Sequence, residues 1–325
     1  MTILSQAETP EARSHTRARR YRQRTVIAAD GTRLACRDHG PIDADYTVVL
    51  LHGFCLAQAT WQPQIRDLQN TSASALRIVS FDHRGHGQSG PAPQDTYTIA
   101  QLGADIDAVL TALSVRGRVI LAGHSMGAMS ALAFLDQRRD DQRHAYRIAG
   151  LVLVATAAAG LPQRGIGRLL AIPGLSALTQ LIAHLPHHAA TEALRTLARP
   201  ICAAATRLAR LSDSERAAFG VASTAALTNT ALLTAVGFLP SLREHDLRHV
   251  LGTISPDVAV SIVSGGADLI TPPAAAAELL AAIPHARHFH DPHAGHMLLH
   301  QAAALVTTAI TTAIATTAIQ AGQVG

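Results

Sequence analysis

Short, continuous apolar runs that alternate with helical patterns are the feature of this sequence that most constrains its fold. Runs of this kind, bounded by loops, are typical of strands buried on both faces of a parallel sheet. Between them, apolar residues recur along single helical faces, for example within 98–113. Strands that alternate with helices predict right-handed β-α-β units and an α/β fold with a doubly wound, mostly parallel sheet. The expected strands are 47–51, 77–81, 118–121, 148–155 and 258–263, and further helices are expected at 126–135, 274–283 and 297–319.

The alternation is modified at two places. Near the N-terminus, Asp30-Gly31 separates two strand-like runs, a combination that predicts a β-hairpin. From residue 160 onward the sequence is rich in Ala and Leu and is interrupted by prolines, which predicts several short helices inserted between two strands. We therefore expect an Arg-rich leader at 1–23, a core formed by 24–159 and 246–325, and a helical cap at 160–245.

The basic residues exclude some chemistries. All 27 are arginine, so the chain can form neither a lysine Schiff base nor a phosphate-binding loop of the GxxxxGK[ST] type. Six of them crowd residues 13–24, a pattern that fits either a tail for nucleic acid or a solvated leader. Because no second basic patch accompanies this run, we interpret it as a leader and expect no nucleic-acid partner.

Cysteine usage and hydropathy bear on the compartment. The three cysteines, Cys36, Cys55 and Cys202, are scattered and odd in number, which predicts neither a disulfide framework nor a zinc site. This favours a reducing compartment, and we expect a cytoplasmic protein. No run approaches the roughly 18 consecutive apolar residues of a membrane span, so no transmembrane segment is expected.

The segment Gly123-His-Ser-Met-Gly127 joins an expected strand to an expected helix. Gly-x-Ser-x-Gly at such a junction is the nucleophile elbow, in which a strained turn raises the serine hydroxyl above the edge of the sheet. Glycine is needed on either side because larger side chains would collide with neighbouring backbone. Ser125 is therefore the candidate nucleophile, and we interpret His124 as structural.

A serine hydroxyl needs a base, and the base needs an orienting acid. In this architecture the chain order is serine, acid, histidine, which selects Asp268 and His296, both in loops that follow expected strands. The rivals are Asp82, Asp257 and Asp291 for the acid and His293 for the base. Asp82 precedes the serine and is assigned instead to stabilising the loop 82–89.

Two backbone amides should bind the oxyanion. One belongs to the residue after the nucleophile, Met126, and the other to an early strand-end loop, where Phe54 of Leu51-His-Gly-Phe54 fits. Trp61, the sole tryptophan, is a candidate for the pocket wall, with core packing as an equal alternative.

Taken together, these motifs resemble the α/β-hydrolase family in its serine esterase and lipase branch. The matching segments are 52–54, 82–89, 123–127, 266–268 and 295–296, in the family's order. The resemblance implies the fold, an inserted cap and a serine triad. Relatives that cleave haloalkanes or epoxides carry Asp at the nucleophile position, and dienelactone hydrolases carry Cys, so Ser125 counts against those three reactions.

Two other patterns suggest a cofactor or a metal. Residues 85–90 match GxGxxG, but Pro91 and Pro93 follow, so no helix opens there and a dinucleotide site is not expected. Six histidines crowd 285–300, yet no carboxylate or thiol completes a familiar ligand spacing. We expect neither a cofactor nor a metal.

The sequence thus predicts a carboxylesterase or lipase-like serine hydrolase. The expected substrate is a small, apolar ester with a short-to-medium acyl chain, cleaved through an acyl-enzyme. Two alternatives stay open: the same triad used for C–C bond, lactone or thioester hydrolysis or for perhydrolysis, and a ligand-binding protein without turnover. The sequence makes no prediction of oligomeric state.

Overall fold

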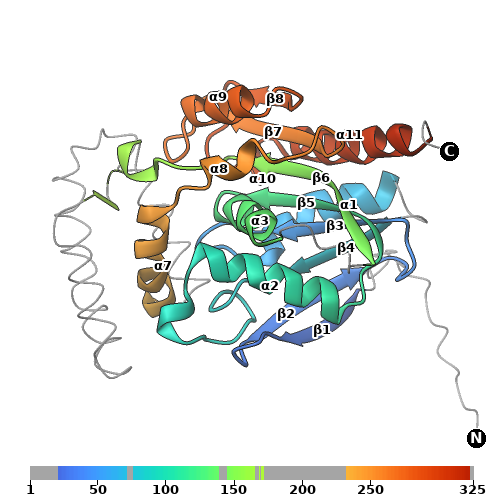
Figure 1. The fold of residues 1–325 in the computed structure, drawn as a ribbon, viewed down its shortest axis with the longest axis horizontal. Coiled ribbons are helices and arrows are strands. Elements are labelled where there is room, and N and C mark those ends of the chain that lie inside the picture. Colours follow the sequence, from blue (N-terminus) through green and yellow to red (C-terminus); the bar gives the residue numbers. More distant parts are fainter. Residues whose placement is uncertain are drawn as a thin grey trace, which may run out of the picture.

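An eight-stranded sheet organises the computed structural model, which describes residues 21–71, 76–138, 145–164, 168, 170, 171 and 232–322. Its strand order is β1-β2-β4-β3-β5-β6-β7-β8 (Figure 1). β1 pairs with β2 and β2 with β4 in antiparallel fashion, and all other pairs are parallel. The predicted hairpin and doubly wound sheet are therefore confirmed. The strands are β1 Arg22–Ile27, β2 Arg33–His39, β3 Tyr46–Leu51, β4 Leu76–Phe81, β5 Gly117–His124, β6 Tyr146–Val154, β7 Ala259–Gly265 and β8 Arg287–Asp291.

Helices cover both faces of this sheet. One face packs against α2 Ile99–Ala112, α3 Met126–Gln137, α8 Arg248–Leu251 and α9 Pro273–Ala282. The other face packs against α1 Gln62–Thr71, α10 Leu298–Gln301 and α11 Ala303–Gly322. The short 3-10 helices are η1 Gln58–Trp61, η2 Gln94–Thr96 and η3 Leu161–Gln163. Figure 1 shows α2 and α3 side by side in front of the strands.

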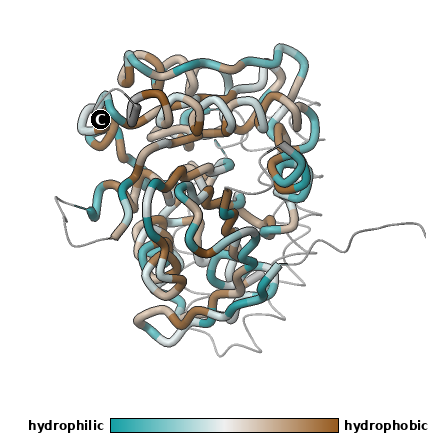
Figure 2. The backbone as a smooth tube through the Cα atoms, turned by 90° about the vertical axis from the view of Figure 1, so that its right-hand side faces the viewer, coloured by the Kyte–Doolittle hydropathy of each residue, from teal (hydrophilic) through white to brown (hydrophobic). Residues whose placement is uncertain are grey.

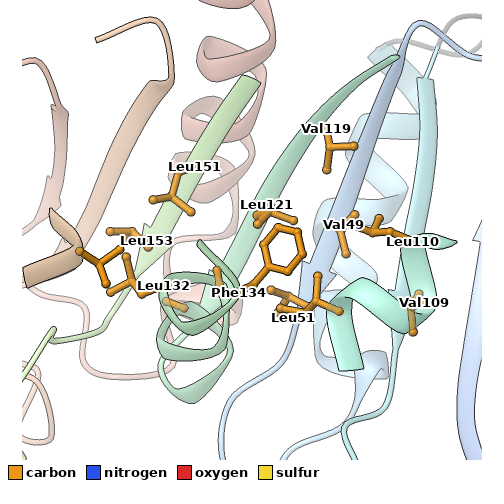
Figure 3. Close-up of a cluster of buried hydrophobic side chains, with 14 of the residues drawn as sticks. Val49, Leu51, Val109, Leu110, Val119, Leu121, Leu132, Phe134, Leu151 and Leu153 are labelled. Carbon is orange, nitrogen blue, oxygen red and sulfur yellow. The ribbon is translucent and has the colours of Figure 1, made fainter. Parts of the chain in front are cut away.

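The central strands explain the continuous apolar runs in the sequence. Along β3, Val49 and Leu51 belong to the core cluster on the α2–α3 side, whereas Val48 and Leu50 belong to the cluster on the α1–α11 side. Figure 3 shows the first of these clusters between the strands and the helices. Figure 2 shows apolar stretches of the chain running through the inside of the fold. Because both sets of side chains leave water, every position of such a strand favours an apolar residue.

Two helices differ from the sequence-based expectation. The helix expected at 297–319 is not continuous: it is divided at Ala302, whose φ of −131° and ψ of 46° are not helical. The break separates α10 from α11. The Gln301 side chain in α10 holds the preceding loop, because its Oε1 accepts a hydrogen bond from the Gly295 amide at 2.8 Å. Helix α1 was not predicted, because only Ile65 and Leu68 mark an apolar face in an otherwise polar segment.

The predicted cap at 160–245 lies mostly outside the described residues, so its boundaries stay a prediction. Its last part forms α7, Leu232–Glu244, which packs near α2. Ser241 Oγ of α7 accepts a hydrogen bond from the Ile99 amide at 2.9 Å. The leader at 1–23 also lies almost wholly outside the described residues, and β1 already begins at Arg22, inside its predicted range. Within the described part of the chain, no helix combines the length and apolar character that a membrane span requires.

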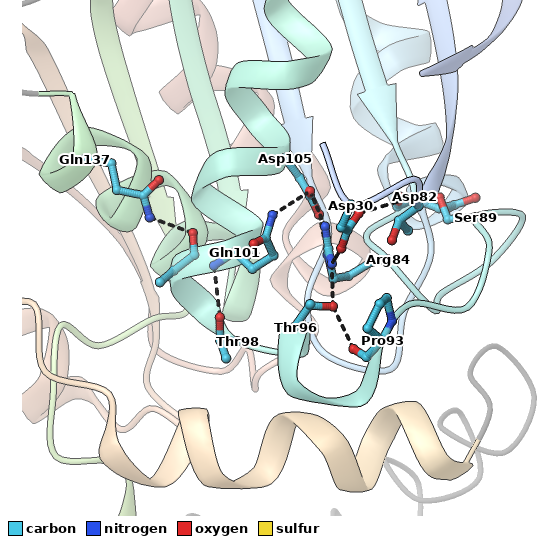
Figure 4. A network of polar contacts seen from close by, with 12 residues as sticks. Asp30, Asp82, Arg84, Ser89, Pro93, Thr96, Thr98, Gln101, Asp105 and Gln137 are labelled. Atoms are coloured by element: carbon cyan, nitrogen blue, oxygen red, sulfur yellow. Dashed lines mark hydrogen bonds and ion pairs between the residues drawn. The ribbon is translucent and has the colours of Figure 1, made fainter. Parts of the chain in front are cut away.

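A buried guanidinium joins the hairpin, the loop after β4 and helix α2 (Figure 4). Arg84 and Asp105 are both completely buried and form a two-pronged ion pair, Nε to Oδ2 at 2.8 Å and Nη2 to Oδ1 at 2.6 Å. Arg84 Nη1 also donates to Asp30 Oδ2 in the hairpin turn and to Thr96 Oγ1, each at 2.6 Å. One side chain therefore ties three segments that are distant in the sequence.

Loss of this guanidinium should destabilise the fold. We expect Arg84→Met to lower the free energy of unfolding by about 3–5 kcal/mol, because the Asp105 carboxylate stays buried without its partner. Urea unfolding followed by circular dichroism measures the change. The double variant Arg84→Met/Asp105→Leu removes both charges and should recover most of the loss. Equal stability of Arg84→Met and the wild type would contradict this assignment.

Candidate active site

Ser125 occupies the sharp turn between β5 and α3. Its φ of 52° and ψ of −118° lie where non-glycine residues are strained. Two residues at and just after the end of β6 hold this conformation: the Ser125 amide donates to Val154 O at 2.8 Å, and Thr156 Oγ1 donates to Ser125 O at 3.0 Å. The strand-to-helix turn that the motif predicts is therefore present, and hydrogen bonds with the end of the adjacent strand and the residues after it hold its strained conformation.

The two glycines of the motif allow the turn to pack closely. A side chain at Gly123 would collide with the backbone of Ala128 in α3. A side chain at Gly127 would collide with the carbonyl group of Leu51, at the end of β3. The first glycine thus lets the helix fold back on its strand, and the second lets that helix approach the neighbouring strand.

In the structure, the ring of His296 contacts the hydroxyl of Ser125 with one nitrogen and the carboxylate of Asp268 with the other. His296 Nε2 lies 3.0 Å from Ser125 Oγ, and His296 Nδ1 lies 2.9 Å from Asp268 Oδ2. A carboxylate only accepts hydrogen bonds, so we assign the ring proton to Nδ1. Nε2 then carries the lone pair and accepts from the serine hydroxyl. Asp268 is buried, and the His296 side chain is 15% exposed.

The Asp268 carboxylate is held in its ionised form. Burial opposes ionisation, but the His296 ring and hydrogen bonds from the loop outweigh burial and place the pKa of Asp268 below its ordinary value. The amides of Ile270 and Thr271 donate to Oδ1 at 2.8 and 2.9 Å, and Thr271 Oγ1 donates to Oδ2 at 2.8 Å. The loop after β7 therefore fixes both the charge and the orientation of this group.

The two amides expected to bind an oxyanion lie on adjoining segments. β3 is the neighbour of β5 in the sheet, so the loop 52–54 leaves the same edge as the serine turn. Gly127, one residue after Met126, packs against the carbonyls of Leu51 and His52. Met126 is the first residue of α3, and the first amides of a helix have no intrahelical partner.

An aromatic contact joins α7 to the loop that holds Phe54. The ring of Phe238 lies 6.4 Å from that of Phe54, 5.7 Å from that of His86 and 5.3 Å from that of Tyr97, measured between centroids. Phe238 is completely buried in a third apolar cluster that also contains Met126 and Leu161. Sequence reasoning missed Phe238, because nothing local in α7 marks which core loop it contacts.

Four buried histidines lie in or around the loop that contains Phe54 and the serine turn: His52, His83, His86 and His124. His52 Nε2 accepts from the His83 amide at 2.9 Å, and His86 Nε2 accepts from the Cys55 amide at 3.2 Å. Burial lowers the pKa of all four, to about 3 for His86 and His124. Neutral imidazoles therefore serve here as fixed donors and acceptors for the backbone.

The remaining candidate residues have structural contacts. Asp82 accepts hydrogen bonds from the amides of Gln58 and Gln88 at 2.7 and 2.9 Å, which confirms its assignment to the loop after β4. Trp61 is completely buried in the cluster on the α1–α11 side, which supports packing over the pocket wall.

In the histidine-rich segment, His288 and His290 share contacts with Ser264 Oγ at 2.8 and 2.9 Å. Among the described residues, no group of three or more His, Cys, Asp and Glu side chains is arranged to hold a metal ion. No helix opens at the end of the GxGxxG match, since the next one is the short η2 at Gln94–Thr96.

The buried neutral histidines should make the fold sensitive to acid. In the unfolded chain they bind protons below about pH 6.5, whereas His86 and His124 resist protonation in the fold down to about pH 3. The free energy of unfolding should therefore fall as the pH drops below 6.5, by up to about 1.4 kcal/mol per pH unit for each such histidine. Urea midpoints between about pH 7 and pH 5 measure this slope. His86→Gln should reduce it, and a constant free energy over this range would contradict the assignment.

Comparison with known proteins agrees with this architecture. Over 113 residues the chain is 36% identical to the probable oxidoreductase EphD of Mycobacterium tuberculosis, covering 34% of this chain and 18% of that protein. It is 32% identical over 151 residues to epoxide hydrolase B of the same organism, covering 46% and 38%. In both curated relatives the matched region spans less than half of the protein's length.

A solved structure is similar over nearly the whole chain. It is the enol-lactonase of Burkholderia xenovorans LB400, with a TM-score of 0.62 and 24% identity, covering 90% of this chain and all of the other. At this identity the similarity concerns the fold alone. Residues 46–303 match the family described as alpha/beta hydrolase fold. The chain therefore belongs to the α/β-hydrolase family.

Proposed function

We propose that this protein is a serine hydrolase that cleaves apolar carboxylic esters with short-to-medium acyl chains through an acyl-enzyme. The observation that carries the proposal is the line of contacts from Ser125 Oγ through His296 to Asp268, on a strained strand-to-helix turn. A hydroxyl, an imidazole and a carboxylate in this order form a nucleophile, its base and the group that orients the base.

Acylation starts from the hydrogen bond between Ser125 Oγ and His296 Nε2. As Oγ attacks the ester carbonyl carbon, its proton passes to Nε2, and the resulting imidazolium is stabilised by the Asp268 carboxylate at Nδ1. When the tetrahedral intermediate collapses, the C–O bond to the alcohol breaks and Nε2 returns the proton to the leaving oxygen. Ser125 then carries the acyl group as an ester.

We assign the developing oxyanion to the amides of Phe54 and Met126. Met126 is the first residue of α3, so its N–H points out of the helix end that favours negative charge. Phe54 lies on the loop that leaves β3 beside this end, and its ring packs against the rings of Phe238 and His86. Donors fixed before the reaction stabilise charge without reorganisation.

Deacylation repeats these steps with water. His296 Nε2 takes a proton from the water that attacks the acyl carbon, and then returns it to Ser125 Oγ as the acid departs. All transferred protons are carried by groups of this chain, so the reaction we propose requires no added cofactor.

The third apolar cluster supports an apolar substrate. Phe238 and Leu161 lie within the range 160–245 predicted for the cap, and they join Met126, the residue after the nucleophile, in this cluster. Among the relatives, one is named an epoxide hydrolase, but Ser125 stands where the resemblance assigns Asp to epoxide cleavage. We therefore favour attack on a carbonyl. The cysteines of the chain are scattered and odd in number, and the Cys36 thiol is free and buried, which supports our assignment to a reducing compartment, the cytoplasm.

Ester hydrolysis should depend on Ser125. We expect the wild type to hydrolyse p-nitrophenyl esters with an optimum at a short or medium acyl chain, and Ser125→Ala to lower kcat by about 10⁴-fold or more. The matched control is Ser261→Ala, a buried serine in β7 that donates to Ala309 O, which should keep the wild-type rate. A folded wild type without turnover at any chain length would reject the esterase proposal and favour the ligand-binding alternative.

Replacing the Asp268 carboxylate should lower kcat. Asparagine would offer its amide group to His296 and favour the wrong tautomer of the ring, so we expect Asp268→Asn to lower kcat by about 10⁴-fold with little change in KM. Because the pKa of Asp268 lies below 3.8, the carboxylate stays charged above that pH, and its titration should not appear in the neutral range of the rate profile. Asp257→Asn, at the exposed rival position, should keep full activity. If Asp257→Asn lost activity and Asp268→Asn kept it, Asp257 and not Asp268 would be the acid of the triad.

A further inference from the structure

His124 connects the nucleophile turn to the backbone of His296. Its ring is completely buried. Nε2 lies 2.8 Å from the carbonyl oxygen of His296, which is 172 positions away in the sequence. The two rings lie 5.0 Å apart between centroids and are tilted by 52°. The residue next to Ser125 therefore contacts the main chain and the ring of the proposed base.

The contacts of His124 define its tautomer. A carbonyl only accepts, so Nε2 must carry the proton, and Nδ1 carries the lone pair. Nδ1 is buried without a hydrogen-bond partner among the described residues. It faces the oxyanion loop so closely that a Cβ at Gly53 would lie 2.7 Å from it. Burial lowers the pKa of His124 to about 3, so the ring stays neutral and remains a donor through Nε2 alone.

We propose that His124 is a positioning residue, which sets the place of His296 relative to Ser125 through the hydrogen bond to His296 O. The inference rests on the proposed function, since it assigns His296 the role of base. It also gives a task to a residue that sequence reasoning treated as structural only.

Other hydrogen bonds hold the loop on either side of the His296 peptide group. Two hydrogen bonds hold the part of the loop that precedes His296. The Gly295 amide donates to Gln301 Oε1 at 2.8 Å, and the Ala267 amide donates to Ala294 O at 3.0 Å. The hydrogen bond from His124 restrains the His296 peptide group itself. His124 ends β5, which pairs with β3 and β6, so the same rigid strand locates both the hydroxyl and its base.

A shift of His296 should affect turnover and leave substrate binding unchanged. His124 is covered by protein and does not line the solvent, so its loss removes no contact to a substrate. A misplacement of a reacting group by about 1 Å costs on the order of 100-fold in rate. We therefore expect a change in kcat at constant KM.

Three substitutions of His124 separate the donor from the ring. The amide nitrogen of His124→Gln can occupy the place of Nε2 and keep the donor. His124→Asn places its amide near the position of Nδ1 and loses the contact, and His124→Phe keeps the ring and loses both nitrogens. With p-nitrophenyl butyrate, His124→Asn and His124→Phe should lower kcat by about 10- to 100-fold at nearly constant KM, whereas His124→Gln should retain kcat within about threefold.

A buried histidine elsewhere is the matched control. His245 Nε2 donates to Ala157 O at 3.2 Å, so His245→Asn removes a similar hydrogen bond and should cost similar stability in thermal unfolding while retaining kcat. If His124→Asn does not fold, the comparison of His124→Phe with His124→Gln replaces it. Three results would each overturn the positioning role: equal kcat in folded His124→Phe and the wild type, equal losses of kcat in His124→Gln and His124→Phe, or the same loss of kcat in His245→Asn as in His124→Asn.

Proton NMR provides a readout that does not depend on turnover. The Nδ1 proton that His296 shares with Asp268 should give a downfield signal in the wild type and in His124→Gln, and the signal should broaden or vanish in His124→Phe. An unchanged signal in His124→Phe would overturn the inference. Absence of Ser125-dependent hydrolysis by the wild type would reject the proposed function separately, and the NMR comparison would still decide whether His124 positions His296.

Discussion

The left-handed backbone of Ser125 is the constraint on which the rest of this site depends. A non-glycine residue adopts φ near +52° only when its surroundings pay for the strain. Here the end of β6 and the segment that follows it form two hydrogen bonds with the Ser125 peptide groups, through Val154 and Thr156. Glycines at 123 and 127 let α3 pack closely on β5 and against the end of β3. The turn thereby lifts one hydroxyl above the sheet and directs the start of α3 toward the same point.

Buried polar groups arrange the loops around that turn. Arg84 joins the hairpin, the loop after β4 and α2, and neutral histidines bind the backbone of the loop 52–55. Such groups are costly to bury unless they are paired. Arg84, His52 and His86 each have a specific partner, so an alternative loop conformation would leave a buried donor or acceptor unsatisfied. These contacts therefore favour the observed geometry of the loops.

The sequence predicts local structure and the order of motifs well, and contacts between distant segments poorly. Ser125, Asp268 and His296 were selected from turn chemistry and chain order, and the structure brings them together. The aromatic contact of Phe238 with Phe54 and the hydrogen bond of His124 to His296 had no local signal. The break at Ala302 also escaped prediction, because neither Gly nor Pro marks it.

The most direct test of the central claim is a crystal structure of the protein after reaction with a fluorophosphonate, together with peptide mapping by mass spectrometry. We predict a single phosphonyl adduct on Ser125, with its phosphoryl oxygen within hydrogen-bond distance of the amides of Phe54 and Met126. Labelling of another residue, a Ser125 that does not react, or an oxygen that points away from both amides would contradict the account.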